Sequence, residues 1–173
     1  MLEAEDDDND VNNEEIDSSP PSMTTDQSGT PIESVLFNAQ SEPQMPTPSD
    51  YEIEELCKIF QRNVDFVLRF VHPPSFQRLV AKKEPYLGHS ADSPAAQTLV
   101  SAAFYACACS ISNSHSLSTF GRRKEELREQ WQHATEQHLA TVDLIRAPGL
   151  VTLQALLLYI VSGTRSLESR YNS

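Results

Sequence analysis

The sequence predicts an all-α fold: an irregular domain of about five helices, preceded by a disordered acidic tail. Three observations support this prediction. Apolar residues recur at steps of three and four from Tyr51 onward. Ser-Pro and Pro-Gly pairs mark the start of one helix and the end of another. No stretch alternates apolar and polar residues in the way that a half-buried strand does.

The first 48 residues are expected to form the disordered tail. Residues 1–57 contain no Lys or Arg and hold 16 of the 25 acidic residues. The block EAEDDDNDVNNEE repels itself and has little apolar surface to bury. The remaining residues carry 13 basic and 9 acidic side chains, so they differ physically from the tail. We place the helical domain at residues 49–163 and a disordered C-terminal end at residues 164–173.

Composition also predicts the environment of the chain. The acidic N-terminus is unlike a signal peptide, and three cysteines without regular spacing favour a reducing compartment. The longest apolar run, around ALLLYIV, is shorter than the roughly 20 residues that span a bilayer. We therefore expect an intracellular protein, nuclear or cytoplasmic, that does not enter a membrane.

The first helix is predicted from Tyr51 to Val71, with Ser49 or Asp50 as its cap. Its apolar residues recur at helical spacing, as expected for a core-facing stripe. Three further apolar residues widen the stripe near its end, which predicts that this end enters a core. The stripe consists of Ile53, Leu56, Phe60, Val64, Val67 and Val71, and the widening residues are Phe66, Leu68 and Phe70.

The sequence RFVHPPSF interrupts this pattern, and a second helix is predicted from Ser75 to Lys83. Pro73 lacks a backbone donor and disfavours helical backbone at His72, so the first helix must stop. A constrained histidine could serve catalysis or form a corner between packed helices. Because no acid, base or metal partner can be named for His72, we interpret the segment as a corner in which Phe76 anchors the second helix.

The third helix is predicted to begin at Pro94, after the cap Ser93, and to occupy the centre of the fold. Its small residues, AAQTLVSAAFYACACSIS, allow neighbouring helices to approach closely. A fourth helix is predicted from Ser118 or Gly121 to Arg146. Its apolar stripe includes Trp131 and His138, and we expect His138 to be partly buried and bonded to a backbone carbonyl.

The fifth helix, residues 150–161, is apolar on nearly all sides. Each leucine left in water would forgo about 1.5–3 kcal/mol, so this helix must be covered on most sides. The four preceding helices can shield only part of it. We therefore expect it to contact a partner, or to begin a larger helical domain, and single out Leu153, Leu156 and Leu157 as interaction residues.

Residues with catalytic or metal-binding chemistry form no recognisable site. Cys107 and Cys109 lie two apart on a helix, so they point about 200° apart and cannot share a metal ion. Cys57 is expected to be a buried, inert thiol. His133 and His138 lack the four-residue spacing of a helical zinc pair. We predict no catalytic residue, no cofactor and no metal ligand in this chain.

Two further segments carry reactive or basic side chains but do not form a functional site. The run SISNSHSLS brings Ser and His together in a predicted loop, without a nucleophile turn or an orienting acid. Arg122, Arg123 and Lys124 are too small a basic cluster for a duplex-binding face, and the acidic tail would oppose contact with phosphates.

Two motifs, in order, resemble the fungal-specific transcription factor domain, the middle homology region of fungal zinc binuclear cluster regulators. The first is LCKIFQRNVDFVLRFVHPPSFQRLV, in which His72, Pro73, Pro74, Ser75 and Phe76 match the His-x-Pro-Ser-Phe-like corner of the family. The second is WQHATEQHLATVDLIRAPGLVTLQALLLYIVSG, in which residues 150–158 match its Leu-rich helix. The resemblance covers about residues 51–163.

The resemblance implies a nuclear, non-catalytic regulatory domain of a transcription factor. The zinc-cluster module of such proteins needs six cysteines, and this sequence has three, so we expect zinc only in a DNA-binding module that is absent here. DNA contact would then be indirect. The family domain also continues beyond the Leu-rich helix, so we expect this one to be incomplete. The alternative is a stand-alone adaptor that pairs with a protein partner, or with itself, through helix 150–161.

Overall fold

A computed structural model describes residues 46–69, 71–144 and 149–171, with side chains through residue 164. No strand occurs in these ranges, where an isolated bridge joins Tyr86 to His89, so the all-α prediction is confirmed. Most of the predicted tail and Phe70 lie outside the described residues. The elements are α2 (Asp50–Ile59), the π-helical turn η1 (Phe60–Asp65), α3 (Phe66–Leu68), α4 (Pro73–Lys82), α5 (Pro94–Ser110), α6 (Asn113–Phe120), α7 (Lys124–Thr141) and α8 (Leu150–Tyr171).

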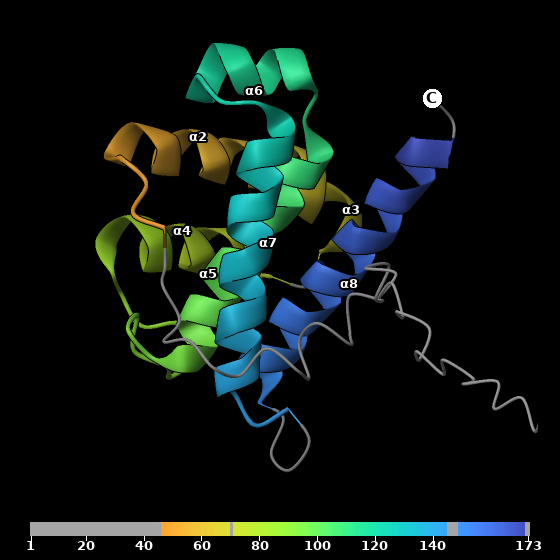
Figure 1. Cartoon of the computed structure of the whole chain (residues 1–173). Helices are drawn as coiled ribbons and strands as arrows, with labels where there is room; N and C mark the ends of the chain where they lie inside the picture. The colour runs from red at the N-terminus through yellow and green to blue at the C-terminus, as the bar shows by residue number, and fades with distance from the viewer. Residues whose placement is uncertain (1–45, 70, 145–148, 172–173) are drawn as a thin grey trace, which may run out of the picture.

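Helix α5 is central, as its small residues predicted. It contacts α7, α8, η1 and α2, and Figure 1 shows α6 across one end of the bundle with α7 and α8 beside it. The predicted cap is present, because Ser93 Oγ accepts from Ala96 N at 3.3 Å and Pro94 opens the helix. The side chains of Ala102, Ala103 and Cys107 are fully buried, which lets the neighbouring helices approach closely.

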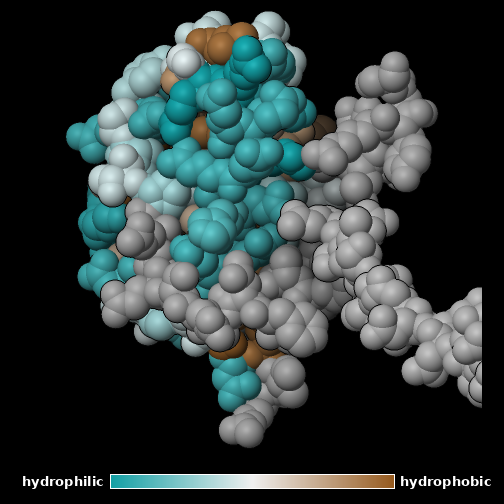
Figure 2. All heavy atoms as spheres, viewed as in Figure 1, coloured by the Kyte–Doolittle hydropathy of each residue, from teal (hydrophilic) through white to brown (hydrophobic). Residues whose placement is uncertain are grey.

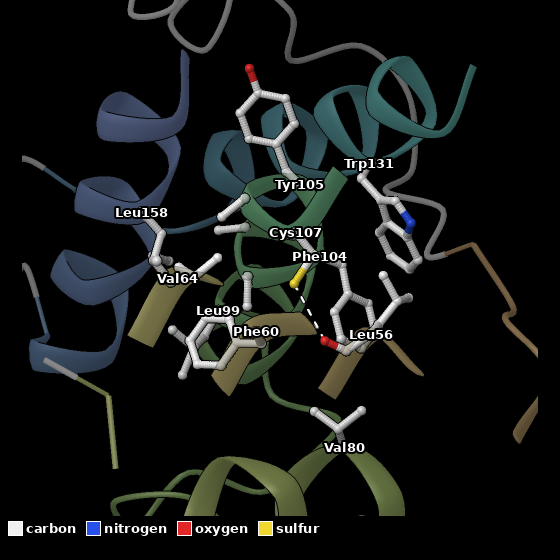
Figure 3. Close-up of a cluster of buried hydrophobic side chains, with 14 of the residues drawn as sticks. Leu56, Phe60, Val64, Val80, Leu99, Phe104, Tyr105, Cys107, Trp131 and Leu158 are labelled. Carbon is white, nitrogen blue, oxygen red and sulfur yellow. Dashed lines mark hydrogen bonds between the residues drawn. The ribbon is translucent and has the colours of Figure 1, made fainter. Parts of the chain in front are cut away.

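Aromatic pairs join the helices in the core, and Figure 3 shows one of them, Phe104 and Trp131. The rings of Phe104 in α5 and Trp131 in α7 meet edge to face with centroids 4.9 Å apart. Phe60 and Phe76 lie 4.7 Å apart and connect η1 to α4. Such pairs contribute about 0.5–1.5 kcal/mol beyond the apolar area that they bury.

The first predicted helix differs at its C-terminal end. Its start is as expected, with Ser49 and Glu52 in a reciprocal capping box. The helix ends at Leu68 rather than Val71, because Arg69 adopts the left-handed region with φ 49°. Phe66 is 68% exposed and Val67 52%, so the prediction that this end enters a core was wrong.

The π-helical turn explains this error. In η1 the backbone closes wider turns than in an α-helix, so the residues after it are rotated relative to a 3.6-residue period. Phe60 and Val64 remain buried on the core side, but the next contact with the core is made by the half-buried Leu68. The 3.6-residue period therefore assigned Val67 to the wrong face of the helix.

Helix α4 begins at Pro73, two residues before the predicted start at Ser75. The two prolines occupy the first helical positions, where the missing N–H groups are not needed. His72 precedes them in extended conformation, with φ −80° and ψ 106°. As predicted, Phe76, Leu79 and Val80 face the core from one side of the helix.

The predicted fourth helix corresponds to α7, and a separate helix that was not predicted, α6, precedes it. The run SISNSHSLS, expected to be a loop, forms most of α6, which Ser112 caps by accepting from His115 N at 3.2 Å. Gly121, with φ 64°, ends α6, and α7 starts only at Lys124. It ends at Thr141, because Val142 is extended, whereas Ile145 and Arg146 lie outside the described residues.

Helix α8 runs to Tyr171, past the predicted end at Val161. Helical backbone therefore occupies positions 164–171, which the sequence predicts to be a disordered end. The domain boundaries stay predictions. No helix in the described ranges is both long enough and apolar enough to cross a membrane.

Candidate interaction surface

The His-Pro corner is held by local hydrogen bonds. His72 Nδ1 lies 2.8 Å from Ser75 Oγ, one turn into α4, and Arg78 Nη2 donates to the same oxygen at 3.4 Å. His72 is exposed and Pro73 is half-buried. Phe76 points inward against Phe60, so the corner holds His72 at the surface and Phe76 in the core.

Asp65, His72 and Ser75 have the composition of a hydrolase triad, but their contacts differ from one. In a triad, the acid accepts a hydrogen bond from the imidazole and so holds its orientation. Here Asp65 Oδ1 is buried and has no hydrogen-bond partner. Burial raises the pKa of Asp65, and the nearby Arg69 and His72 oppose that rise. The His72–Ser75 contact is therefore a local contact at the start of a helix and not part of a catalytic triad.

An open groove of about 720 Å³ lies beside this corner. Its walls join the end of the first helix, the corner, the turn after α4 and the start of α8. Three large apolar side chains on its walls, Phe66, Leu87 and Leu150, are more than half exposed. Asp65, Arg69 and His72 supply its charged and titratable groups, so its lining combines apolar and polar side chains.

The groove continues onto one side of α8. Leu150 is 64% exposed, Leu153 40% and Leu157 49%, and their spacing places them along one stripe of the helix. We call Leu150, Leu153 and Leu157 the exposed leucine face. Leu156 is half-buried, and the opposite side of α8 is buried through Val151, Ala155, Leu158 and Tyr159.

The exposed leucine face contrasts with the surface of α7. Figure 2 shows that surface as largely hydrophilic, with apolar colour confined to small areas. Adjacent exposed apolar side chains are characteristic of protein interaction sites, whereas isolated ones are ordinary. The face and the groove together form the candidate interaction surface.

Phe76, predicted to anchor the second helix, and Trp131, predicted on the apolar stripe of the fourth, both lie in the core. Each is 2% exposed, and they pack against Phe60 and Phe104. They position α4 and α7 but do not reach the surface. Of the predicted set, the structure therefore brings together His72, Pro73, Leu153 and Leu157 around the surface, with Leu156 at its margin.

The three cysteines are free thiols. Burial raises the pKa of Cys57 to about 11 and raises those of Cys107 and Cys109. Cys107 Sγ donates to Leu56 O at 3.4 Å (Figure 3). Thiols held in this protonated state are poor nucleophiles and poor metal ligands. Within the described ranges, no three His, Cys, Asp or Glu side chains gather where they could share a metal ion.

Buried polar groups join α7 to α8, a contact that the sequence did not predict. Glu136 Oε1 accepts from Tyr159 Oη at 2.5 Å and from Gln132 Nε2 at 3.0 Å. His138 is fully buried rather than partly buried, and its Nε2 bonds to no group. Burial lowers the pKa of His138.

Sequence reasoning missed Phe66, Leu87 and Leu150 as surface residues. Phe66 was expected to widen the stripe that enters the core, but it stands two residues after the buried Val64 and therefore on the opposite side of the helix. Leu87 has φ 48° in the turn that the Tyr86–His89 bridge closes, and no periodicity indicates its exposure. The exposure of Leu150 could have been predicted from its spacing, because it lies three residues before Leu153 and seven before Leu157 and so shares their face of the helix.

Comparison with known proteins found similarity to C6 finger domain transcription factors of fungi. The chain is 34% identical over 116 residues to nscR of Arthroderma gypseum, covering 67% of this chain and 16% of that protein. It is 30% identical over 108 residues to adaR of Aspergillus niger, covering 62% and 14%. It is 31% identical over 122 residues to nscR of Arthroderma benhamiae, covering 70% and 17%.

The chain thus spans about a sixth of the length of the curated relatives that it matches. No family model matches the chain. No solved structure matches it.

Proposed function

We propose that this chain is part of the regulatory region of a C6 zinc-cluster transcription factor, and that it acts in the nucleus without catalysis. The observation that carries the proposal is its 30–34% identity to C6 finger domain transcription factors over about two thirds of its length. An all-α region with an exposed leucine face is consistent with a role in protein contacts.

The proposal assigns DNA contact to other residues of such a regulator. Three cysteines cannot supply the six ligands of a C6 cluster, and within the described ranges their thiols belong to no group of three side chains that could share a metal ion. Zinc would therefore be bound elsewhere in the regulator. At the corner, His72 Nδ1 lies 2.8 Å from Ser75 Oγ and Asp65 Oδ1 has no hydrogen-bond partner, which supports a structural role over hydrolysis.

The candidate interaction surface is the part of the region that we assign to contacts with further protein. It would pack against more of the regulatory region, making this chain an incomplete domain. A second function, a stand-alone adaptor that pairs through α8, is favoured by the same exposed Leu153 and Leu157. The two functions differ in whether the isolated chain forms a defined complex.

A reporter assay tests the regulatory role. The full chain is fused to an unrelated DNA-binding domain, and transcription is measured beside a fusion that carries L153S and L157S. We expect the unmodified fusion to change reporter output and the double variant to lose most of that effect at equal protein level. A fusion without any effect on transcription would contradict the regulatory role.

The variant H133Q serves as the matched control, because His133 is exposed on α7, whose residues do not line the groove. It should regulate like the unmodified fusion.

A further inference from the structure

A second cavity lies apart from the interaction surface, between residues 46–48 and helices α4, α5 and α7. Its volume is about 340 Å³, and it is half enclosed. Small-molecule sites in proteins have volumes of about 300–1,000 Å³ and are concave, largely apolar and provided with a few polar groups. The cavity meets these conditions, so its lining decides what it could hold.

Trp131 lines the cavity and carries its most unusual polar group. The side chain is 2% exposed, and Nε1 is a buried donor without any hydrogen-bond partner. Figure 3 shows this nitrogen on the edge of the indole ring that faces away from Phe104. A buried, unpaired N–H costs free energy that a hydrogen-bond acceptor would recover. Because this donor is already desolvated, it favours a ligand that brings an acceptor.

The remaining lining selects for a neutral, apolar molecule. Val80, Val100 and Phe104 contribute apolar walls. Lys83 and Asp92 are the charged residues among the lining side chains, and their opposite charges leave the cavity without net charge. An ionic ligand would lose its hydration without a compensating charge, so a carbonyl or ether oxygen is the acceptor that fits.

We propose that this cavity binds a small, neutral and mainly apolar molecule, and that Trp131 Nε1 donates a hydrogen bond to its carbonyl or ether oxygen. The site is separate from the exposed leucine face, and residues of α4, α5 and α7 all contact the bound molecule. Occupancy would therefore stabilise the packing of these helices, so the proposal goes beyond the regulatory role and does not depend on it.

Trp131 is the single tryptophan of the chain, so its indole N–H gives one isolated signal in a ¹H–¹⁵N NMR spectrum. The full ¹⁵N-labelled chain is titrated with 1-tetralone and, separately, with tetralin, which has nearly the same shape but no carbonyl. We expect both to bind and 1-tetralone to bind more tightly, by about two- to tenfold, the worth of one net hydrogen bond. Only 1-tetralone should move the indole proton strongly downfield.

Variants separate the cavity from other apolar surface. In W131F an aromatic ring remains but the indole N–H donor is lost. 1-Tetralone should then bind no better than tetralin when affinity is measured by calorimetry. A91F fills the cavity from the half-buried Ala91 on its wall, and should abolish binding of both probes while the Trp131 signal persists. L153S, on the exposed leucine face, should leave both affinities unchanged.

Several results would overturn the proposal: equal affinity for the two probes, an unmoved indole signal, no binding by either probe, or loss of binding in L153S. If W131F fails to fold, A91F and the indole signal of the unmodified chain still decide the question. The reporter assay does not enter this test, so failure of the site and failure of the regulatory role are distinguishable.

Discussion

At the scale of single residues, burial separates side chains that are neighbours in the sequence. His72 and Phe76 belong to the same corner, yet His72 is exposed and bonded to Ser75, whereas Phe76 is buried against Phe60. Core contacts therefore come from the phenylalanine, and the histidine contributes a local helix start.

Replacing Phe76 with alanine should lower the free energy of unfolding by about 3–5 kcal/mol, because it leaves a cavity beside Phe60. H72A should lower it by no more than about 1 kcal/mol, the worth of one exposed hydrogen bond. Urea unfolding followed by circular dichroism measures both. Equal losses in the two variants would contradict this separation of roles.

His138 makes stability depend on pH. Burial lowers its pKa below the ordinary value of about 6.5, so the unfolded chain binds a proton there that the folded chain does not. The free energy of unfolding should therefore fall as the pH drops below about 6.5, by at most about 1.4 kcal/mol per pH unit from this group.

The substitution H138Q should reduce this loss of stability between pH 7.5 and 5.5. Urea midpoints at several pH values measure the effect. H133Q is the control, since His133 lies on the same helix but is exposed. If H138Q and the unmodified chain lose stability equally, the buried histidine is not the cause.

At the scale of elements, the break between α6 and α7 depends on one backbone conformation. Gly121 adopts φ 64°, and no atom lies within 4 Å of the position that a Cβ would occupy. A side chain there would meet open space, so only backbone strain opposes substitution.

G121A should therefore cost about 1–2 kcal/mol of stability, the penalty of left-handed backbone for an ordinary residue. G149A provides the matched control, because Gly149 does not have positive φ and its nearest neighbour, Thr152 Oγ1, lies 4.0 Å away. We expect G149A to be neutral or stabilising by up to about 1 kcal/mol. Thermal unfolding compares the two, and similar destabilisation would refute the strain argument.

At the scale of the whole molecule, the surface formed by α7 is largely hydrophilic, whereas α8 exposes large apolar side chains. Helix α5 is covered by α7 and α8, but α8 has no such cover on its exposed leucine face. The ion pair between Glu52 and Arg122 joins the first helix to the segment before α7 by a polar contact.

The double variant L153S/L157S should change how the molecule associates. Size-exclusion chromatography with light scattering should show self-association or aggregation of the unmodified chain and a smaller, better-behaved species for the variant, with unchanged helicity. L158S is the control, because Leu158 is buried and its replacement should unfold the chain. A monomeric, fully soluble unmodified chain would contradict this prediction.

Local signals in the sequence determined a large part of the fold. Ser93-Pro94 gave the start of α5, small residues gave its central position, and the prolines after His72 gave the corner. Each signal acts within one helical turn, through a missing N–H or a capping hydroxyl, and is therefore readable without knowledge of distant residues. The exposure of Leu153 and Leu157 followed from having too much apolar surface for the preceding helices to cover.

Only the tertiary structure decided which faces those helices present. The π-helical turn rotated Val67 away from the core, Gly121 separated α6 from α7, and the packing of α7 buried His138 and left Trp131 Nε1 unpaired. These outcomes depend on contacts between residues far apart in the chain, such as Phe104 with Trp131 and Glu136 with Tyr159. Periodicity within one helix does not contain that information, because burial is set by the neighbours that the folded chain brings together.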